Sequence, residues 1–112
     1  MTNNVDSNWP VNPFSRMVVY ISGPMAGIEN FNHDAFNQAQ YRLEQRGYNV
    51  LNPAKLPIGL TDSAYMDIGL AMIRASDIVL LLDGHEKSKG AQAEKAYAER
   101  IGLTMMEQSQ IE

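Results

Sequence analysis

The fold is decided by the stretch Asp77-Ile-Val-Leu-Leu-Leu-Asp83-Gly84-His-Glu-Lys-Ser-Lys-Gly90-Ala-Gln-Ala-Glu94-Lys-Ala-Tyr-Ala-Glu-Arg-Ile101. Its run 78–82 is continuously apolar, which is typical of a strand covered on both faces. A polar loop at 83–90 follows, and then a helix whose inward side is Ala91, Tyr97, Ala98 and Ile101. Glu94 falls near the middle of that side. Because a buried carboxylate is expensive to desolvate, we interpret Glu94 as a functional residue.

Composition narrows the class of protein. A chain of 112 residues forms one domain, and 45% hydrophobic with 20% charged residues is typical of soluble globular proteins. The net charge of −4 argues against a partner that is a nucleic-acid polymer. The absence of cysteine excludes disulfides and thiolate–zinc sites and fits a cytoplasmic protein. No apolar run approaches the ~20 residues of a membrane span, and the N-terminus lacks a signal-peptide pattern, so no membrane partner is expected.

Strands and helices are expected to alternate along the chain. Residues 1–15 are predicted to be an arm that is either disordered or docked on a neighbouring subunit, and 16–112 a single domain. We expect strands at 17–22, 48–51, 77–82 and 103–106, the last followed by a polar tail, and helices at about 32–46, 61–75 and 91–101. This order predicts an α/β, three-layer, Rossmann-like (flavodoxin-like) parallel sheet of about four to five strands, with helices on both faces. Ligands are expected at the carboxyl ends of the strands.

Two loops stand at those carboxyl ends. The turn 23–27 contains glycines that let backbone approach a ligand, and Asn30 or Asn32 is expected to cap the next helix. His33, in its first turn, is interpreted as a solvated histidine. The loop 54–60 is long enough to cover a pocket as a lid, after which Thr61, Asp62 or Ser63 begins a helix.

Several kinds of site can be set aside. His33 and His85 lack metal-ligand spacing with each other, so neither a metal nor a cofactor is predicted. No Ser-His-Asp or Cys-His arrangement is recoverable. The loop 87–90 is too short for a nucleoside-triphosphate P-loop, but at a helix N-terminus it can hold one phosphate through Ser88, a lysine and backbone N–H groups. A solvated turn is the alternative interpretation of that loop.

Three segments carry a resemblance to a known family. They are Tyr20-Ile-Ser-Gly23-Pro24-Met25, the strand 77–82, and Gly84-His-Glu-Lys-Ser-Lys-Gly90-Ala-Gln-Ala-Glu94. Together they resemble the nucleoside 2-deoxyribosyltransferase-like superfamily over residues 17–106. The resemblance is greatest to its small proteins called domain of unknown function 4406, which are common in bacteriophages and prophages. It therefore also implies the cytoplasm of a bacterial host, if the protein is phage-encoded.

The resemblance implies cleavage, by hydrolysis or transfer, of the N-glycosidic bond of a deoxynucleoside or deoxynucleoside 5′-monophosphate. The glutamate of Gly-x-x-x-Glu, here Glu94, would be the nucleophile. Ser88 matches a phosphate-binding serine of related nucleotide N-glycosidases, and Lys87 or Lys89 would assist. The substrate-binding residues implied in this way are Tyr20, Ser22, Gly23, Pro24, Met25, Gly69, Asp83, Gly84, His85, Ser88, Lys89 and Gly90. A homo-oligomer with a pocket shared between subunits is also implied.

Two positions depart from the superfamily pattern. Gly69 stands where a catalytic or ribose-binding aspartate is usual, and His85 replaces the tryptophan usual in the phage group. Asp67 is the nearest carboxylate, but it lies on the polar side of the predicted helix and can act only if that helix is shifted. Three hypotheses follow: an N-glycosidase or transferase that uses Glu94, a nucleotide-binding accessory or regulatory module without turnover, and a scaffold in which Glu94 pairs with a basic residue.

Overall fold

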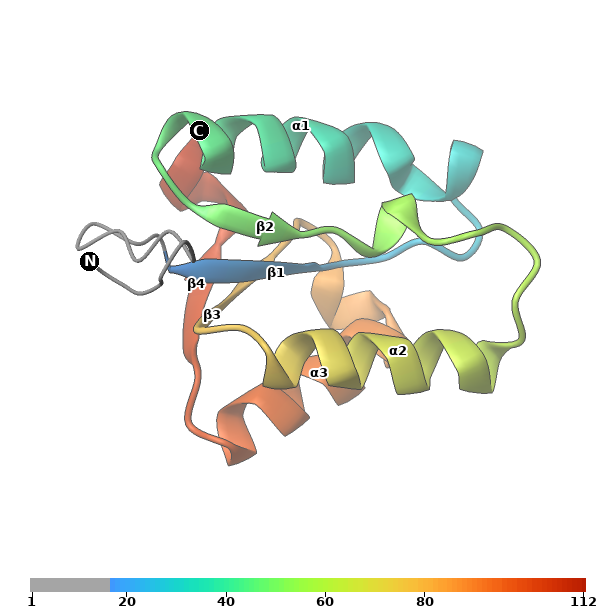
Figure 1. Ribbon diagram of the computed structural model, residues 1–112. Helices are drawn as coiled ribbons and strands as arrows, with labels where there is room; N and C mark the ends of the chain where they lie inside the picture. The colour runs from blue at the N-terminus through green and yellow to red at the C-terminus, as the bar shows by residue number, and fades with distance from the viewer. Residues whose placement is uncertain (1–16) are drawn as a thin grey trace, which may run out of the picture.

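A computed structural model describes residues 17–112; the predicted arm, residues 1–15, lies outside the described residues. The elements alternate as expected, with strands β1 (Val18–Ser22), β2 (Asn49–Leu51), β3 (Ile78–Leu81) and β4 (Thr104–Glu107) and helices α1 (His33–Gln45), α2 (Asp62–Arg74) and α3 (Lys89–Arg100). The strands form one parallel sheet in the order β2-β1-β3-β4. Figure 1 shows α1 on one face and α2 and α3 on the other. The predicted three-layer α/β fold is confirmed.

Each face of the sheet has its own apolar core. Val19 and Ile21 of β1 pack toward α1, with Phe36, Ala39 and Leu43. Tyr20 points to the opposite face, where it packs with Ile73 of α2 and Ala98 of α3. Because successive strand residues alternate between faces, Ser22 points to the same side as Tyr20. Two hydroxyl side chains of β1 therefore face the layer formed by α2 and α3.

Three expectations about element ends were wrong. Asn32 does precede α1, but its side chain makes no cap; its Nδ2 donates to the carbonyl oxygen of Pro24 instead, at 2.9 Å. Ile101 is 43% exposed because it lies just beyond the end of α3, where the inward stripe stops. The tail is not simply polar, since a 3₁₀ turn at Gln108–Ile111 places Ile111 in the core beside α1.

The path of the chain concentrates loops at one end of the sheet. The segments after β1, β2 and β3 all leave from the carboxyl ends of these parallel strands, at the right of Figure 1. The segment after β2 crosses from the α1 layer to the start of α2 at that end. Within residues 17–112, no helix has the length and apolar character needed to cross a membrane.

Candidate active site

The carboxylate of Glu94 is held from both sides by β1. The Tyr20 hydroxyl donates to Oε2 of Glu94 at 2.7 Å, and the Ser22 hydroxyl donates to Oε1, also at 2.7 Å. The two donors come from the same face of one strand, two residues apart, so both reach the single carboxylate that α3 presents. Charge-assisted hydrogen bonds of this length are among the stronger ones in proteins. They fix the position of both carboxylate oxygens.

Burial changes the titration of this pair. Loss of water raises the pKa of the Glu94 carboxyl above its ordinary value of 4.5, although the hydrogen bonds from Ser22 and Tyr20 act in the opposite direction. Desolvation, followed by the nearby charge of Glu94, raises the pKa of the Tyr20 phenol far above its ordinary value. Tyr20 therefore remains a hydrogen-bond donor at any working pH. No cation pairs with Glu94 among residues 17–112, so the scaffold hypothesis, which required a basic partner, has no support in the described contacts.

Gly69 of α2 lies directly against this carboxylate. A Cβ at position 69 would lie 2.7 Å from Oε2 of Glu94 and 3.1 Å from the Tyr20 hydroxyl oxygen. A glycine inside a helix lowers its stability by roughly 1 kcal/mol relative to alanine. Its presence here is explained by space: the carboxylate of Glu94 occupies the volume that a side chain at 69 would need.

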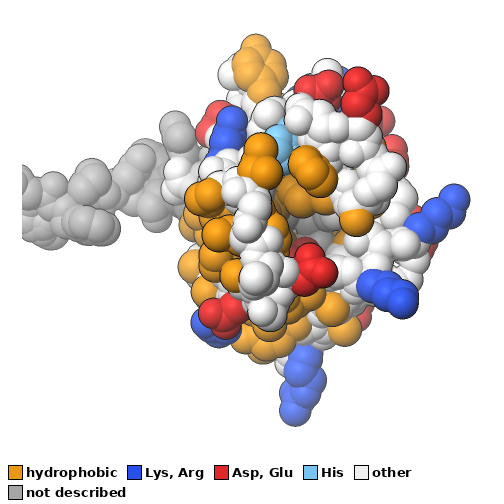
Figure 2. Space-filling model, turned by 90° about the vertical axis from the view of Figure 1, so that its right-hand side faces the viewer, with side chains coloured by type: hydrophobic (Ala, Val, Ile, Leu, Met, Phe, Trp, Pro, Cys, Tyr) orange, Lys and Arg blue, Asp and Glu red, His pale blue; other side chains and the backbone are white. Residues whose placement is uncertain are grey.

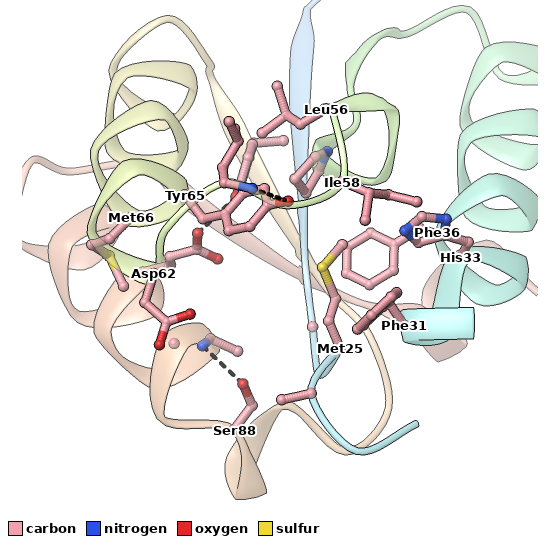
Figure 3. A pocket seen from close by; sticks show the side chains of 18 of the residues that line it. Met25, Phe31, His33, Phe36, Leu56, Ile58, Asp62, Tyr65, Met66 and Ser88 are labelled. Atoms are coloured by element: carbon pink, nitrogen blue, oxygen red, sulfur yellow. Dashed lines mark hydrogen bonds between the residues drawn. The ribbon is translucent and has the colours of Figure 1, made fainter. Parts of the chain in front are cut away.

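A cavity of about 690 Å³ opens in front of Glu94 at the carboxyl end of the sheet. Figure 2, which looks onto this end, shows a hollow with an acidic side chain at its edge and hydrophobic side chains gathered around it. In Figure 3, Met25, Phe31, His33 and Phe36 lie on one side of this main cavity, and Asp62, Tyr65 and Met66 lie on the opposite side. Leu56, Ile58 and Leu60 of the predicted lid also line it. Its walls are thus largely apolar, with few polar groups, as in many small-molecule sites.

A second, smaller cavity of about 410 Å³ adjoins the main cavity and shares Met25, Ala26, Ser88 and Gly90 with it. Lys87, Lys89 and Pro24 complete its lining. The N-terminus of α3 lies here, where the Ser88 hydroxyl caps the helix by accepting from the Ala91 N–H at 3.1 Å. The side cavity therefore combines two lysines with the positive end of a helix dipole. This is a suitable environment for an anion.

Comparison with known proteins agrees with the predicted family. Residues 17–107 match the family described as Domain of unknown function (DUF4406). The chain belongs to this family. No curated protein matches the sequence. Among solved structures, the fold is similar to that of a 2-desoxiribosyltransferase from Leishmania mexicana, with a TM-score of 0.67 and 20% identity over 81% of this chain. The chain spans 63% of the length of that structure.

Most of the site residues predicted for this DUF4406 chain lie at the two cavities. Tyr20, Gly23, Met25, Ser88 and Gly90 line the main cavity, and Pro24 and Lys89 line the side cavity. Ser22 and Gly69 contact Glu94 behind the cavity wall. Gly23 also has a packing role, since a Cβ there would lie 2.7 Å from Cβ of Leu82.

Four predicted residues lie elsewhere. Asp83 is exposed, and Gly84 packs against Pro24 without lining either cavity. His85 is buried outside both cavities, with Nε2 3.4 Å from Oε1 of Glu107, because the 3₁₀ turn His85–Lys87 directs it toward β4. Asp67 is on the exposed side of α2, as its place in the helical pattern indicated, and does not line the cavity.

The DUF4406 chain also has cavity residues that the sequence did not reveal. His33, expected to be solvated, is half-buried on the cavity wall. Phe31 is brought to the cavity mouth by a backbone in which Asn30, Phe31 and Asn32 all have positive φ, from 50° to 62°. Such angles are uncommon for non-glycine residues; Asn adopts them more readily than most, but a phenylalanine such as Phe31 rarely does. Asp62 was considered only as a helix start. One signal was available for it: Asp62 lies seven residues before Gly69, on the same side of α2.

Proposed function

We propose that the protein is an enzyme that cleaves the N-glycosidic bond of 2′-deoxynucleoside 5′-monophosphates, with Glu94 as the nucleophile. The observation that carries the proposal is the half-buried Glu94 carboxylate, held by Tyr20 and Ser22 at the wall of a largely apolar cavity. A carboxylate can form a glycosyl ester with the anomeric carbon, which splits one difficult displacement into two easier ones. The deoxyribosyltransferase named among the similar structures supports the same class of substrate.

The chemistry follows from the position of this carboxylate. One oxygen of Glu94 forms a bond to C1′ while the C1′–N bond breaks, and the bonding electron pair leaves on the base nitrogen. The base takes up a proton from solvent water as it departs. Water, or a second base in a transfer reaction, then attacks C1′, loses a proton to solvent and releases Glu94 as a carboxylate. Each carboxylate oxygen accepts one hydrogen bond, from Tyr20 or from Ser22, and has a further lone pair. Glu94 can therefore attack C1′ while both of these hydrogen bonds are kept.

A 5′-phosphate suits the side cavity. Lys87 and Lys89 supply positive charge there, and the N-terminus of α3 lines it at Lys89 and Gly90. Because Ser88 and Gly90 line both cavities, one ligand can extend from Glu94 into the side cavity. This continuity supports a nucleotide over a nucleoside as substrate.

A second copy of the chain is proposed to complete the pocket. Phe31 and Ile58 line the main cavity but are 50% and 75% exposed, so the mouth of the pocket presents apolar surface to the solvent. Covering such surface is favourable by roughly 25 cal/mol per Å². Sedimentation over a dilution series should show a dimer or larger assembly, and only monomer at every concentration would count against a shared pocket.

The function is tested by chromatography of free bases after incubation with each of the four common 2′-deoxynucleosides and their 5′-monophosphates. Wild type should release base, most efficiently from monophosphates. Glu94→Gln should release none, while Glu99→Gln, which alters an exposed glutamate on the same helix, should behave as wild type.

The competing hypothesis is a binding module without turnover. It is favoured by Gly69, which leaves no carboxylate at the position where the superfamily resemblance implies one. Calorimetric titration of the same monophosphates separates the two hypotheses. Binding by both wild type and Glu94→Gln, with no base released by either, would replace the enzyme proposal with the binding module.

A further inference from the structure

The polar groups at the outer end of the main cavity are few. Its polar side chains other than Tyr20 and Glu94 are His33, Asp62, Tyr65 and Ser88. The Tyr65 hydroxyl is engaged with the lid, donating to the carbonyl oxygen of Pro57 at 2.6 Å, and Ser88 lies at the end near α3. His33 and Asp62 are therefore the groups left to recognise a ligand at the end away from Ser88.

Asp62 lies on the same side of α2 as the position that contacts the Glu94 carboxylate. Gly69 contacts that carboxylate, and Asp62 lies seven residues earlier on α2, close to two full turns. At a rise of 1.5 Å per residue, the two positions are about 10.5 Å apart along the helix axis. A nucleotide with its anomeric carbon at a near-attack distance of ~3–3.5 Å from Glu94 would extend its base along this side of α2 toward Asp62.

The two polar groups differ in what they can recognise. A neutral imidazole has one donor and one acceptor nitrogen and can offer either to a base. An ionised carboxylate only accepts hydrogen bonds. Asp62 is in the first turn of α2, where the helix dipole favours negative charge, and no side chain among residues 17–112 forms a hydrogen bond or ion pair with it. Its two oxygens are therefore available to a ligand.

We propose that Asp62 selects the base, and that the selected base is guanine. This inference rests on the proposed function, because it requires a nucleotide in the main cavity. Guanine presents adjacent N1–H and N2–H donors, which match the two oxygens of a carboxylate. The other common bases place an acceptor beside each donor on that edge, and the acceptor would face the negative charge. The apolar side chains of the two cavity walls, including Met66 on the side of Asp62 and Phe36 on the opposite side, suit the flat faces of a purine.

The sharpest test compares dGMP with dIMP, which lacks only the 2-amino group. Wild type should show a kcat/KM for dGMP about 10- to 100-fold above that for dIMP, the discrimination expected of a paired hydrogen bond to a base. Asp62→Asn should bring the ratio close to one, because its amide presents a donor to the base. Asp67→Asn is the matched control on the exposed side of α2 and should keep the wild-type ratio. Because Asp62 is exposed, thermal denaturation should show both variants folded.

Calorimetric binding of dGMP and dIMP to Glu94→Gln separates this inference from the proposed function. Preference for dGMP that disappears in Glu94→Gln/Asp62→Asn supports the role of Asp62 even if wild type releases no base. Base release without preference for dGMP, or with a preference that Asp62→Asn leaves unchanged, overturns the inference while the glycosidase function stands. Absence of both binding and release overturns both.

Discussion

Gly69 and Glu94 are complementary in shape: the carboxylate fills the space beside a glycine, and a Cβ on that glycine would lie 2.7 Å from Oε2. The position where the superfamily resemblance implies an aspartate is thus occupied by part of the proposed nucleophile. Glu94 can accept hydrogen bonds from Tyr20 and Ser22 in this position only because residue 69 has no side chain. A side chain at position 69 should therefore displace the Glu94 carboxylate.

Gly69→Ala should separate stability from function. The new methyl group gains roughly 1 kcal/mol of helix propensity. It also displaces a carboxylate that is held by hydrogen bonds from Tyr20 and Ser22, and a hydrogen bond to a charged group contributes about 1.5–3 kcal/mol. We therefore expect the variant to fold, with the free energy of unfolding lowered by about 1–2 kcal/mol. Base release should fall at least about tenfold, because Glu94 is moved away from Tyr20. Ala71→Gly, an exposed position on the same helix, is the control for propensity alone and should lower stability without a comparable loss of activity. Unchanged activity in Gly69→Ala would show that the resting position of the carboxylate is unimportant.

The strands, the helices and Glu94 were predictable because each has a local signal. The run 78–82 is apolar throughout, the stripe of α1 repeats at helical spacing, and Glu94 interrupts an apolar stripe. The rest of the cavity has no such signal. Phe31 depends on three residues with positive φ, and Asp62 lines the cavity together with residues that are distant in the sequence, such as Met25 and Ser88. Both are consequences of tertiary packing, which residue patterns along a single segment do not encode.

Tyr20→Phe should shift the pH dependence of base release. The nucleophile must be ionised, so activity falls as pH drops through the raised pKa of Glu94. Removing the Tyr20 hydroxyl deletes a hydrogen bond that favours the anion, so that pKa rises further and the acid limb moves to higher pH. We also expect at least a tenfold loss of kcat at neutral pH, since a hydrogen bond to a charged group contributes about 1.5–3 kcal/mol. Tyr41→Phe, at an exposed tyrosine, should leave the profile unchanged, and an unshifted limb in Tyr20→Phe would contradict this assignment.

Glu94→Gln should stabilise the protein above the acidic range. The folded pKa of Glu94 is raised above its ordinary 4.5, so between the unfolded and folded pKa values the native state binds more protons than the unfolded state. Stability of the wild type therefore declines as pH rises through that window and stays lower above it. Chemical denaturation of both proteins at a series of pH values should show the variant more stable at pH 7. The difference should shrink as the pH falls through the raised pKa of Glu94 and should level off below about 4.5. A stability difference between the variant and wild type that grows toward low pH would contradict this prediction.

Ser88→Ala should affect phosphate recognition as well as helix capping. The loss of the cap to Ala91 destabilises the protein by about 1 kcal/mol. Thr61→Ala removes the equivalent cap of α2, where Oγ1 accepts from the Ala64 N–H at the same distance of 3.1 Å, and should be destabilising to a similar extent. Only Ser88→Ala should reduce the preference for a monophosphate over its nucleoside, by about five- to tenfold in kcat/KM. Equal preference in both variants would mean that the phosphate does not contact Ser88.

Tyr65→Phe should loosen the lid formed by residues 54–60. The Tyr65 hydroxyl accepts from the Leu60 N–H at 3.3 Å (Figure 3) and donates to the carbonyl oxygen of Pro57 at 2.6 Å, which ties the lid to α2 at two positions. The ring itself is kept in the variant, so the wall of the cavity is unchanged. With each hydrogen bond contributing about 0.5–1.5 kcal/mol, the amide of Leu60 should exchange with solvent faster and KM should rise about five- to tenfold. Because the Tyr65 hydroxyl bonds to the lid and not to Glu94, kcat should change less than KM. Wild-type exchange at Leu60 in Tyr65→Phe would show that the lid is held by its apolar contacts alone.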